Sequence, residues 1–592
     1  MRKKYNAIQI VRHKGEHLLR DSLLNKSHGF SKEERERLDL RGLVPPAVLS
    51  MDQQVNLIMG EFEHGIMHLA AKNEDDEVMK SGVTPQMIRK WKLLDSIYNR
   101  DETLYYYILM KNIKEMAPIV YTPTVGWVCK HFSSIFRRLR GMFISIQDKG
   151  HISTILNNWP NKRVEAIVVT DGSRILGLGD LGIGGLGISK GKLDLYVGAG
   201  GFHPQKILPV VIDVGTNNQE LLDNPFYLGL RQNRVEGEEY IDLIDEFVAS
   251  ATDKWPNVLI QFEDFQFKHA VELLNRYREE FLIFNDDIQG TSAVVLAGII
   301  GALRVQGLRP KAITETRFVV VGAGSAGLGV LYKLHLFLQR YGLSDMEAGE
   351  NFWVLDKDGL ITQNRENTSR KARKYWRKET EDEGMGLLEV IKKYKPHCLI
   401  GLSGQGGIFT PEILQEMNKL EDGRKPMIFP LSNPTSRSEC TAEDVFKYTQ
   451  GEAIFGSGSP FPDIVENGKI FKSNQTNNVY VYPGLALGAY LGKCKLISDN
   501  MIISAAEALT ELLEPVDIAE RAIFPPLEEI RECSVHIAAR VMEQAYKENH
   551  LRNKEAKIYL QKSLEDLKKY IRMKQWDPKY RPLVFKMPGV DE

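Results

Sequence analysis

Two pairs of adjacent acidic residues, Glu263-Asp264 and Asp286-Asp287, are the side chains in this sequence whose spacing most suggests chemistry. Each pair follows an apolar, β-prone run, VLIQF before the first and FLIF before the second. Four carboxylates held close together would repel one another unless a cation lay among them. The pattern therefore indicates a bound metal ion or a nearby Lys or Arg, with two solvated strand ends as the alternative.

The segment between the two pairs, AVELLNRYREE, has apolar residues at helical spacing, so residues 261–290 and the run before them predict a strand, a helix and a second strand. In a parallel unit of this kind both strands end at the same edge of the sheet, where α/β proteins bind their ligands. We therefore expect the four carboxylates to face one crevice.

Candidate partners for these carboxylates lie upstream. A glycine-dense run, GLGDLGIGGLGISKGKLDLYVGAGG, contains Lys192 and follows Arg174, and such glycine density marks a close approach of backbone or ligand. The run is not a P-loop, because Leu186 and Leu193 occupy positions that the P-loop pattern reserves for Gly and Ser or Thr. Tyr121, in APIVYTPTVGW, ends a short apolar run at a turn, which is typical of a packed aromatic.

A dinucleotide fingerprint follows at residues 322–327. Gly322, Gly324 and Gly327 lie between the apolar run RFVVV and a long helical pattern, with Ser325 and Ala326 inside the loop. A phosphate would bind there, at the helix N-terminus.

The next predicted strand, FWVLD, ends at Asp356, an acid that favours NAD over NADP, although it lies beyond the usual spacing of about 20 residues. Lys357 and the basic run Arg370, Lys371, Arg373 and Lys374 are alternatives for a 2′-phosphate. We interpret that run as a solvated loop, because its surroundings are polar.

Composition restricts the class of protein. The 592 residues suggest several domains, and 43% hydrophobic with 26% charged residues is typical of a globular protein. The net charge of -1 gives no reason to expect a nucleic-acid partner or a membrane partner. Five scattered cysteines indicate a reducing compartment rather than disulfides. The N-terminus MRKKYNAIQIVRHKG lacks the features of a secretory signal or a transit peptide.

Residues 1 to about 120 and the C-terminal part show helical patterns, and the chain ends in a charged tail that resembles a docking arm. Asn433 and Asn478 lie at turns beside predicted strands, where Asn is common for conformational reasons.

Many motifs, in order, resemble the malic enzymes, and several resemble the NAD-linked members of plant mitochondria and bacteria. They are YTPTVG, TDGSRILGLGDLG, GKLDLY, DVGTNN, FYLGLRQ, IDEF, QFEDF, FNDDIQGT, GAGSAGLGV, SNPT, GSPF and NNVYVYPG. This resemblance implies oxidative decarboxylation of (S)-malate to pyruvate and CO2 with NAD, NADP being possible, and with Mg2+ or Mn2+.

The resemblance also implies roles for individual residues. Catalysis falls to Lys192 as base, Tyr121 as acid and Asp286 as the partner of the lysine, and a lysine base requires a lowered pKa. The metal ligands would be Glu263, Asp264 and Asp287, malate would contact Arg174, Asn433 and Asn478, and the cofactor would contact Gly322, Gly324, Ser325, Ala326, Gly327, Asp356 and Asn433. Arg100 is a candidate allosteric residue.

The implied architecture is α/β, with a Rossmann-like doubly wound cofactor domain. We expect a helical N-terminal domain at 1–138, a substrate lobe at 139–285 completed by 478–549, the dinucleotide-binding domain at 286–477 and a tail at 550–592. The family further implies a homotetramer and the mitochondrial matrix, with the cytoplasm as the alternative. Departures such as Ser189 and AGGFHPQ leave open a weakly active or regulatory subunit that pairs with a homologue, while a simple malate dehydrogenase would leave the acidic residues without a task.

Overall fold

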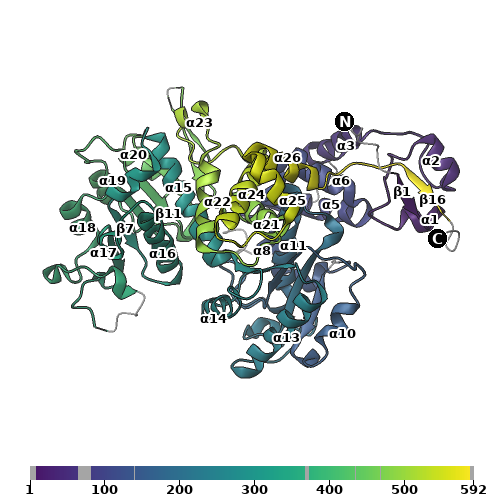
Figure 1. The fold of residues 1–592 in the computed structure, drawn as a ribbon, viewed down its shortest axis with the longest axis horizontal. Coiled ribbons are helices and arrows are strands. Elements are labelled where there is room, and N and C mark those ends of the chain that lie inside the picture. The colour runs from purple at the N-terminus through teal and green to yellow at the C-terminus, as the bar shows by residue number, and fades with distance from the viewer. Residues whose placement is uncertain are drawn as a thin grey trace.

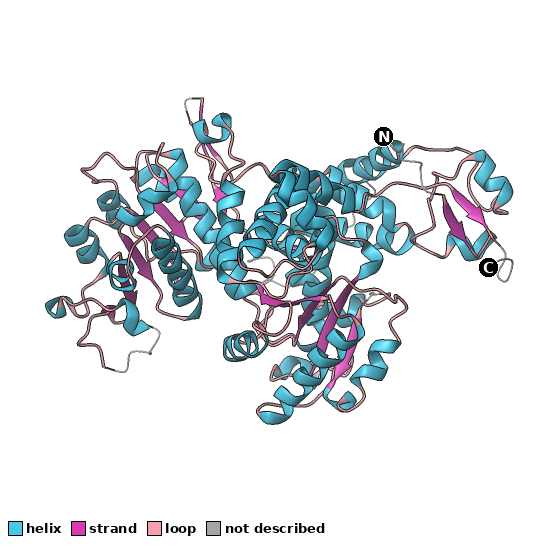
Figure 2. Ribbon diagram, viewed as in Figure 1, coloured by secondary structure: helices cyan, strands magenta, loops and turns pink. Residues whose placement is uncertain are grey.

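The computed structural model describes residues 8–64, 82–138, 141–366, 372–433, 435–466 and 468–586. Figures 1 and 2 show a helical N-terminal part, two lobes each built on its own sheet, and a group of C-terminal helices between them. The predicted α/β class with parallel sheets is confirmed.

Helices dominate the N-terminal part, as predicted, and side chains define where they begin. The Thr84 hydroxyl accepts a hydrogen bond from the Met87 amide, and the Asp101 carboxylate accepts one from the Leu104 amide, so both cap the free N–H groups of a first helical turn. The helices are α1 (Gly15–Leu19), α2 (Lys32–Arg37), α3 (Met51–His64), α5 (Pro85–Arg100), α6 (Glu102–Lys111), α7 (Ile113–Val120), α8 (Thr124–Lys130) and α9 (Phe132–Ile135). The helical pattern expected for this region is confirmed where the structure describes it, and residues 65–81 lie outside the described residues.

The first lobe is a five-stranded parallel sheet in the order β2-β4-β3-β5-β6. Its strands are β2 (Met142–Ser145), β3 (Ala166–Thr170), β4 (Ile207–Asp213), β5 (Leu259–Phe262) and β6 (Ile283–Asn285). Its helices are α10 (Ile152–Asn157), α11 (Leu186–Leu195), α12 (Gln219–Asp223), α13 (Glu238–Lys254) and α14 (Phe267–Tyr277). The strand, helix and strand predicted around residues 261–290 correspond to β5, α14 and β6, and the two strands are parallel neighbours.

The second lobe is a seven-stranded sheet in the order β15-β12-β11-β10-β7-β8-β9, parallel except for β9. Its strands are β7 (Phe318–Val321), β8 (Phe352–Asp356), β9 (Gly359–Leu360), β10 (Cys398–Gly401), β11 (Met427–Pro430), β12 (Ile454–Ser457) and β15 (Asn474–Gln475). Its helices are α15 (Thr291–Val305), α16 (Ser325–Arg340), α17 (Asp345–Glu350), α18 (Leu387–Tyr394), α19 (Pro411–Met417) and α20 (Ala442–Tyr448). A small hairpin, β13 (Ile464–Glu466) and β14 (Lys469–Phe471), projects from this lobe.

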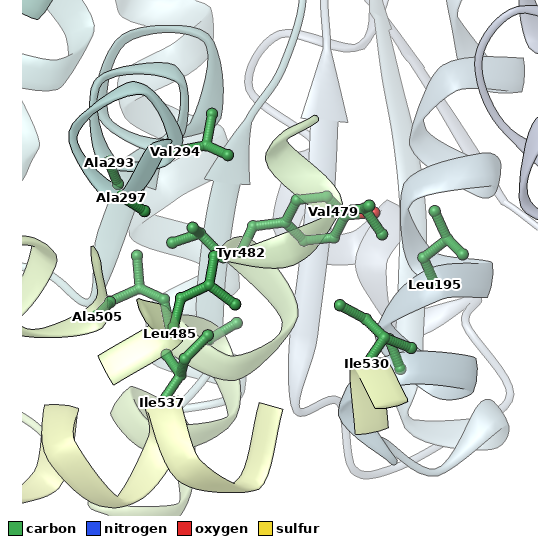
Figure 3. Close-up of a cluster of buried hydrophobic side chains, with 14 of the residues drawn as sticks. Leu195, Ala293, Val294, Ala297, Val479, Tyr482, Leu485, Ala505, Ile530 and Ile537 are labelled. Carbon is green, nitrogen blue, oxygen red and sulfur yellow. The ribbon is translucent and has the colours of Figure 1, made fainter. Parts of the chain in front are cut away.

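A continuous apolar core joins the parts. Figure 3 shows Val294 and Ala297 of α15 close to Leu485, Ala505 and Ile537 of the C-terminal helices. Those helices are α21 (Tyr482–Leu491), α22 (Asp499–Thr510), α23 (Pro515–Ala519), α24 (Ile530–Lys547), α25 (Lys554–Lys562) and α26 (Leu564–Lys574). Within the described chain, one helical stretch, Asp286–Val305, is long and apolar enough to cross a membrane, but 78% of its apolar window is buried inside the protein, as in a core helix.

The described part of the C-terminal tail packs on the N-terminal part of the same chain. Strand β16 (Leu583–Phe585) pairs in parallel with β1 (Gln9–Val11), a strand that the helical pattern of this region did not predict. The Tyr580 hydroxyl donates a hydrogen bond of 2.5 Å to Asp101. Figure 1 shows the β1–β16 pair at one extremity of the molecule.

Candidate active site

The carboxyl ends of β5 and β6 bring the predicted acidic residues together. One oxygen each of Glu263, Asp264 and Asp287 lies within 4.8 Å of the others, a group suited to a metal ion. Asp264 has a positive φ of 56°, which Asp tolerates better than most residues, and its amide donates a 2.8 Å hydrogen bond to Asp287. Asp264 in turn accepts a hydrogen bond of 3.0 Å from the amide of Leu176.

Lys192 reaches the same place from α11. Its ammonium forms an ion pair with Asp286 and lies 3.0 Å from Glu263, and all three side chains are buried. The ammonium also lies over the rings of Tyr121 and Tyr482, at 5.0 and 4.3 Å from their centroids. Lys192 is therefore held between carboxylates and aromatic faces.

The electrostatics of the lysine differ from the expectation for a lysine base. Burial lowers the pKa of Lys192, but the negative charges of Asp286 and Glu263 raise it, and the pKa of Lys192 is well above its ordinary value. A lysine base requires a lowered pKa, whereas with the protein groups alone the two carboxylates outweigh desolvation and raise the pKa of Lys192. Burial also raises the pKa of Tyr121 well above its usual range, which keeps its phenol protonated at neutral pH.

Burial raises the pKa values of Glu263, Asp264 and Asp287. For Asp287 the pKa rises to about 6. The positive charge of Lys192 and, more weakly, that of Arg174 oppose this rise. Burial likewise raises the pKa of Glu263 and of Asp264 well above their ordinary values. A divalent cation among these oxygens would stabilise their ionised forms.

Asp286 is positioned by residues remote in sequence. Its Oδ2 accepts a 3.0 Å hydrogen bond from Asn478, which also donates to Thr291 at 3.1 Å. Its Oδ1 is buried without a hydrogen-bond partner in the described part of the chain. A Cβ atom at Gly290 would lie 1.7 Å from that oxygen, so only glycine leaves room for the carboxylate.

Two residues at the site were missed by the sequence reasoning. Gln261 donates a 2.7 Å hydrogen bond to Glu263 and accepts one of 2.5 Å from Tyr196. Gln261 and Glu263 are two residues apart at the end of β5, so the strand period could have placed them on one face. Tyr482 has no comparable local signal, because only the packing of α21 brings it to Lys192.

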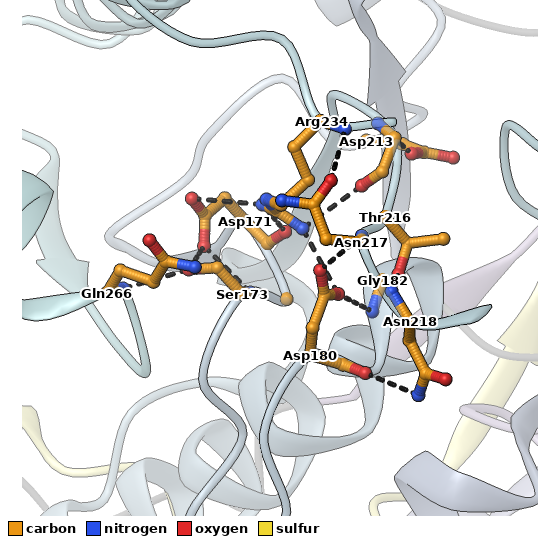
Figure 4. A network of polar contacts seen from close by, with 12 residues as sticks. Asp171, Ser173, Asp180, Gly182, Asp213, Thr216, Asn217, Asn218, Arg234 and Gln266 are labelled. Atoms are coloured by element: carbon orange, nitrogen blue, oxygen red, sulfur yellow. Dashed lines mark hydrogen bonds and ion pairs between the residues drawn. The ribbon is translucent and has the colours of Figure 1, made fainter. Parts of the chain in front are cut away.

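A buried network supports the loop that carries Arg174 (Figure 4). Arg234 forms ion pairs with Asp171 at 3.1 Å and Asp180 at 3.2 Å. Asp171 Oδ1 accepts from the Ser173 hydroxyl, and that hydroxyl accepts from the backbone amide of Gln266 at 2.8 Å. The network ties this loop to the turn after Asp264, and the backbone amide of exposed Arg174 donates to the Asp264 carbonyl oxygen at 3.2 Å.

The dinucleotide fingerprint has its predicted setting between β7 and α16. Gly322 has φ of 117°, and a Cβ there would lie 2.5 Å from the Leu402 carbonyl oxygen. Gly324 is exposed with open space around it, and Gly327 lies in the first turn of α16. The backbone of Ser325 and Ala326 begins that helix.

Asp356 ends β8, as predicted, but its carboxylate is already engaged. Both oxygens accept hydrogen bonds from Arg365, at 2.8 and 2.9 Å, and Arg365 also forms an ion pair with Glu383. Arg365 is not among the residues that the sequence motifs predicted for the site. Its positive charge offsets the acid that was expected to discriminate against a 2′-phosphate.

The described contacts of Asn433, of Arg100 and of the basic run are made away from the Lys192 cluster. Asn433 is exposed and follows β11 of the cofactor sheet. It accepts a 2.8 Å hydrogen bond from Ser459, which follows β12. Arg100 is exposed at the end of α5. In the basic run, Lys374 pairs with Asp345 at 2.7 Å, whereas Arg370 and Lys371 lie outside the described residues.

The fold and site together are those of a dinucleotide-dependent oxidoreductase with a buried lysine and carboxylate centre. Family models agree with this class. The model for the malic enzyme N-terminal domain matches residues 98–278, and the model for the malic enzyme NAD binding domain matches residues 288–546.

The chain is also similar to whole proteins. It is 45% identical over 585 residues to the 59 kDa isoform of the mitochondrial NAD-dependent malic enzyme of Solanum tuberosum, covering 97% of this chain and 95% of that protein. It is 44% identical over 541 residues to the NADP-dependent malic enzyme of Dictyostelium discoideum, covering 91% and 95%. The crystal structure of the malic enzyme from Pyrococcus horikoshii matches with a TM-score of 0.51 at 25% identity, covering 78% and 88%. The chain belongs to the malic enzyme family, which oxidatively decarboxylates malate with NAD(P)+.

Proposed function

We propose that this chain oxidises (S)-malate at C2 with NAD+ and releases CO2 and pyruvate, with Mg2+ or Mn2+ held by Glu263, Asp264 and Asp287. The observation that supports this most is the position of the three carboxylates beside Lys192 at the ends of β5 and β6. Hydride transfer requires removal of a hydroxyl proton, and Lys192 is the amine that lies beside these carboxylates.

The residues take complementary roles in this proposal. Lys192 accepts the proton of the C2 hydroxyl, and Asp286, held by Asn478, stabilises the resulting ammonium. Tyr121, protonated because of its burial, donates a proton to C3 of the enol. Arg174 and Asn433 hold the substrate or the nicotinamide ribose, and the loop from Gly322 to Gly327 binds the pyrophosphate.

The proposed metal fits the residues present. The proposed ligands are hard carboxylate oxygens, and burial raises their pKa values, a rise that a bound cation would counteract. Bound there, the metal would polarise the C2 oxygen, stabilise the charge that develops as CO2 leaves, and offset the carboxylates that raise the pKa of Lys192.

Cofactor preference and setting belong to the same proposal. We favour NAD+ because Asp356 ends β8, with NADP+ as the alternative that Arg365 permits. The proposal includes a substrate lobe at 139–285 with 478–549 and a cofactor lobe at 286–477. It also includes a homotetramer located in the mitochondrial matrix, and the similarity to mitochondrial relatives supports this location.

The test is malate-dependent formation of NADH, followed at 340 nm, with the purified chain. We expect turnover with Mg2+ or Mn2+ and none with a chelator, and pyruvate rather than oxaloacetate should accumulate. Turnover that is insensitive to the chelator would refute the metal role. An inactive purified chain that gains activity only with a homologue would instead favour the regulatory-subunit alternative.

Lys192→Ala tests the assignment of the base. Turnover should fall by about 100-fold or more, because general base catalysis contributes on that order, while NAD+ binding measured by quenching of protein fluorescence should persist. Lys206→Ala, which removes a partly exposed ion pair with Glu165, is the matched control and should keep most of the activity. Normal turnover in Lys192→Ala would contradict the assignment.

A further inference from the structure

A cavity of about 510 Å³, lined by both apolar and polar side chains, lies against α11 on the side away from the catalytic centre. Lys190 and Asp194 of α11 line it, and Lys190 is two residues from Lys192. Positions two apart on an α-helix face nearly opposite directions, so α11 separates this cavity from the Lys192 cluster. Its volume falls within the range of about 300–1,000 Å³ that is usual for small-molecule sites.

Lys190 is a buried cation at the base of the cavity. Its ammonium lies 2.9 Å from Asp194 and over the ring of Tyr98, at 4.4 Å from the centroid. Asp194 also accepts hydrogen bonds from the hydroxyls of Tyr105, at 2.7 Å, and Tyr106, at 3.2 Å. The two tyrosine hydroxyls satisfy Asp194 without the lysine. The buried Lys190 ammonium has three N–H donors, and among the described residues it uses one of them, on Asp194.

Exposed Arg20 and Arg138 add positive charge to the lining, and exposed His13 and His17 add aromatic rings. Arg20 also forms an exposed ion pair with Glu16 at 2.5 Å. Of the two acids in the lining, Asp21 turns back to accept from the amide of Leu23 at 3.0 Å, and Asp194 is occupied as described above.

Trp159 supplies a further donor. Its indole Nε1 is buried and has no hydrogen-bond partner among the residues that the structure describes. A donor of this kind usually finds an acceptor when it is buried. Tyr98, Pro160 and Pro209 give the same cavity apolar surface.

We propose that this cavity is a second ligand site, separate from the catalytic centre, that binds a phosphate monoester with a planar apolar body. The phosphate would contact Lys190 and the guanidinium groups of Arg20 and Arg138, which suit bidentate recognition of phosphate. The planar body would lie against Tyr98 and Trp159.

Phenyl phosphate is a suitable probe for calorimetric titration of the full-length protein. The titration is run with NAD+, Mg2+ and pyruvate present, so that the catalytic centre is filled. Saturable binding should persist, and inorganic phosphate and benzoate should each bind more weakly, because each lacks part of the proposed ligand. Binding of phenyl phosphate that disappears when the catalytic centre is filled would overturn the proposal.

Two variants localise the binding. Lys190→Met removes the buried charge but keeps the length of the side chain, and Arg138→Gln changes an exposed position that folding does not require. Each should weaken phenyl phosphate about tenfold, as expected for a hydrogen bond to a charged group. Arg137→Gln, at the adjacent exposed arginine that does not line the cavity, is the matched control and should bind normally.

Arg138→Gln keeps the test decisive if Lys190→Met does not fold. Unchanged affinity in Arg138→Gln and in any folded Lys190→Met would overturn the proposal. So would the absence of saturable binding to the unmodified protein at about 10 mM phenyl phosphate, a concentration at which even a millimolar site would be filled.

Discussion

Two buried carboxylates, Asp286 and Glu263, surround the Lys192 ammonium and raise its pKa. The same contacts orient it, since Asp286 is held by Asn478 and Glu263 by Gln261. Lys192 can act as a base only when the charge around it changes so that its pKa falls. At the scale of single residues, the catalytic centre is therefore defined by the charges around one ammonium.

Gly290 is the tightest steric constraint on that centre. Gly290→Ala would place a methyl group 1.7 Å from Asp286 Oδ1, so the carboxylate or the helix must move. Since the backbone at Gly290 has an ordinary helical φ of -68°, the effect would be steric rather than conformational. We expect a loss of at least about tenfold in kcat/KM for malate, because a small misplacement of a catalytic group is costly.

The control for Gly290→Ala is Gly60→Ala. Gly60 lies in α3, and a Cβ there meets nothing within 4 Å. Alanine should be neutral or raise Tm slightly, because it favours helix by up to about 1 kcal/mol over glycine. Equal kcat/KM in the two variants would show that the Asp286 carboxylate tolerates displacement.

At the scale of elements, the segment after β9 brings Arg365 to the end of β8. Arg365 neutralises Asp356, so the acid is a weaker barrier to a 2′-phosphate than its position at the end of β8 implies. Arg365→Gln should therefore raise the ratio of kcat/KM for NAD+ to that for NADP+ by about fivefold or more, as the uncompensated carboxylate repels phosphate.

Steady-state kinetics with both cofactors measure this ratio. Lys357→Gln is the control, because this exposed neighbour pairs with Asp358 rather than Asp356 and should change the ratio less. A ratio that stays constant in Arg365→Gln would mean that Asp356 does not face the ribose.

The cap of α6 is a second element with a measurable property. Burial raises the pKa of Asp101 to about 6, although Tyr580 and the Leu104 amide donate to it. The unfolded chain loses this proton near pH 4, so the stabilising contribution of Asp101 is complete below about pH 4 and is lost as the pH rises through about 6. The loss amounts to about 3 kcal/mol.

Asp101→Asn should remove this dependence. The Tm of Asp101→Asn relative to that of the unchanged protein should increase between about pH 4.5 and pH 7 in thermal-shift measurements. Asp242→Asn, in an exposed pair with Lys149, should show a difference that stays nearly constant with pH. A constant Tm difference for Asp101→Asn would contradict the raised pKa.

At the scale of the whole molecule, Asp499 at the start of α22 joins the two lobes. It forms an ion pair with Arg278, which follows α14 of the five-stranded lobe, at 2.8 Å, and another with Lys333 of α16 in the cofactor lobe. The Lys333 side chain is 4% exposed, so it depends on this partner. Asp499→Asn should cost about 3–5 kcal/mol of stability, as expected when a buried cation is left unpaired.

Chemical denaturation checks this value. Asp242→Asn again serves as the surface control and should cost little. If Asp499→Asn unfolds with the same midpoint as the unchanged protein, the contact does not hold the lobes together.

Several features could be predicted from the sequence because their signals are local. The apolar, β-prone runs and the helical pattern around residues 261–290 predicted β5, α14 and β6, and parallel pairing then required Glu263 and Asp287 to converge. The spacing of Gly322, Gly324 and Gly327 was sufficient for the dinucleotide loop, because backbone conformation there depends on glycine itself.

Only the tertiary structure decided the rest, because the deciding contacts join distant residues. Asn478 reaches Asp286 across 192 positions, and β1 pairs with β16 near the opposite end of the chain. The charge state of Lys192 depends on burial and on two carboxylates at once, and neither burial nor these distances are visible in a local pattern. The sequence alone thus determined which chemical groups are present and which strands carry them, while packing decided which groups meet and how their charges balance.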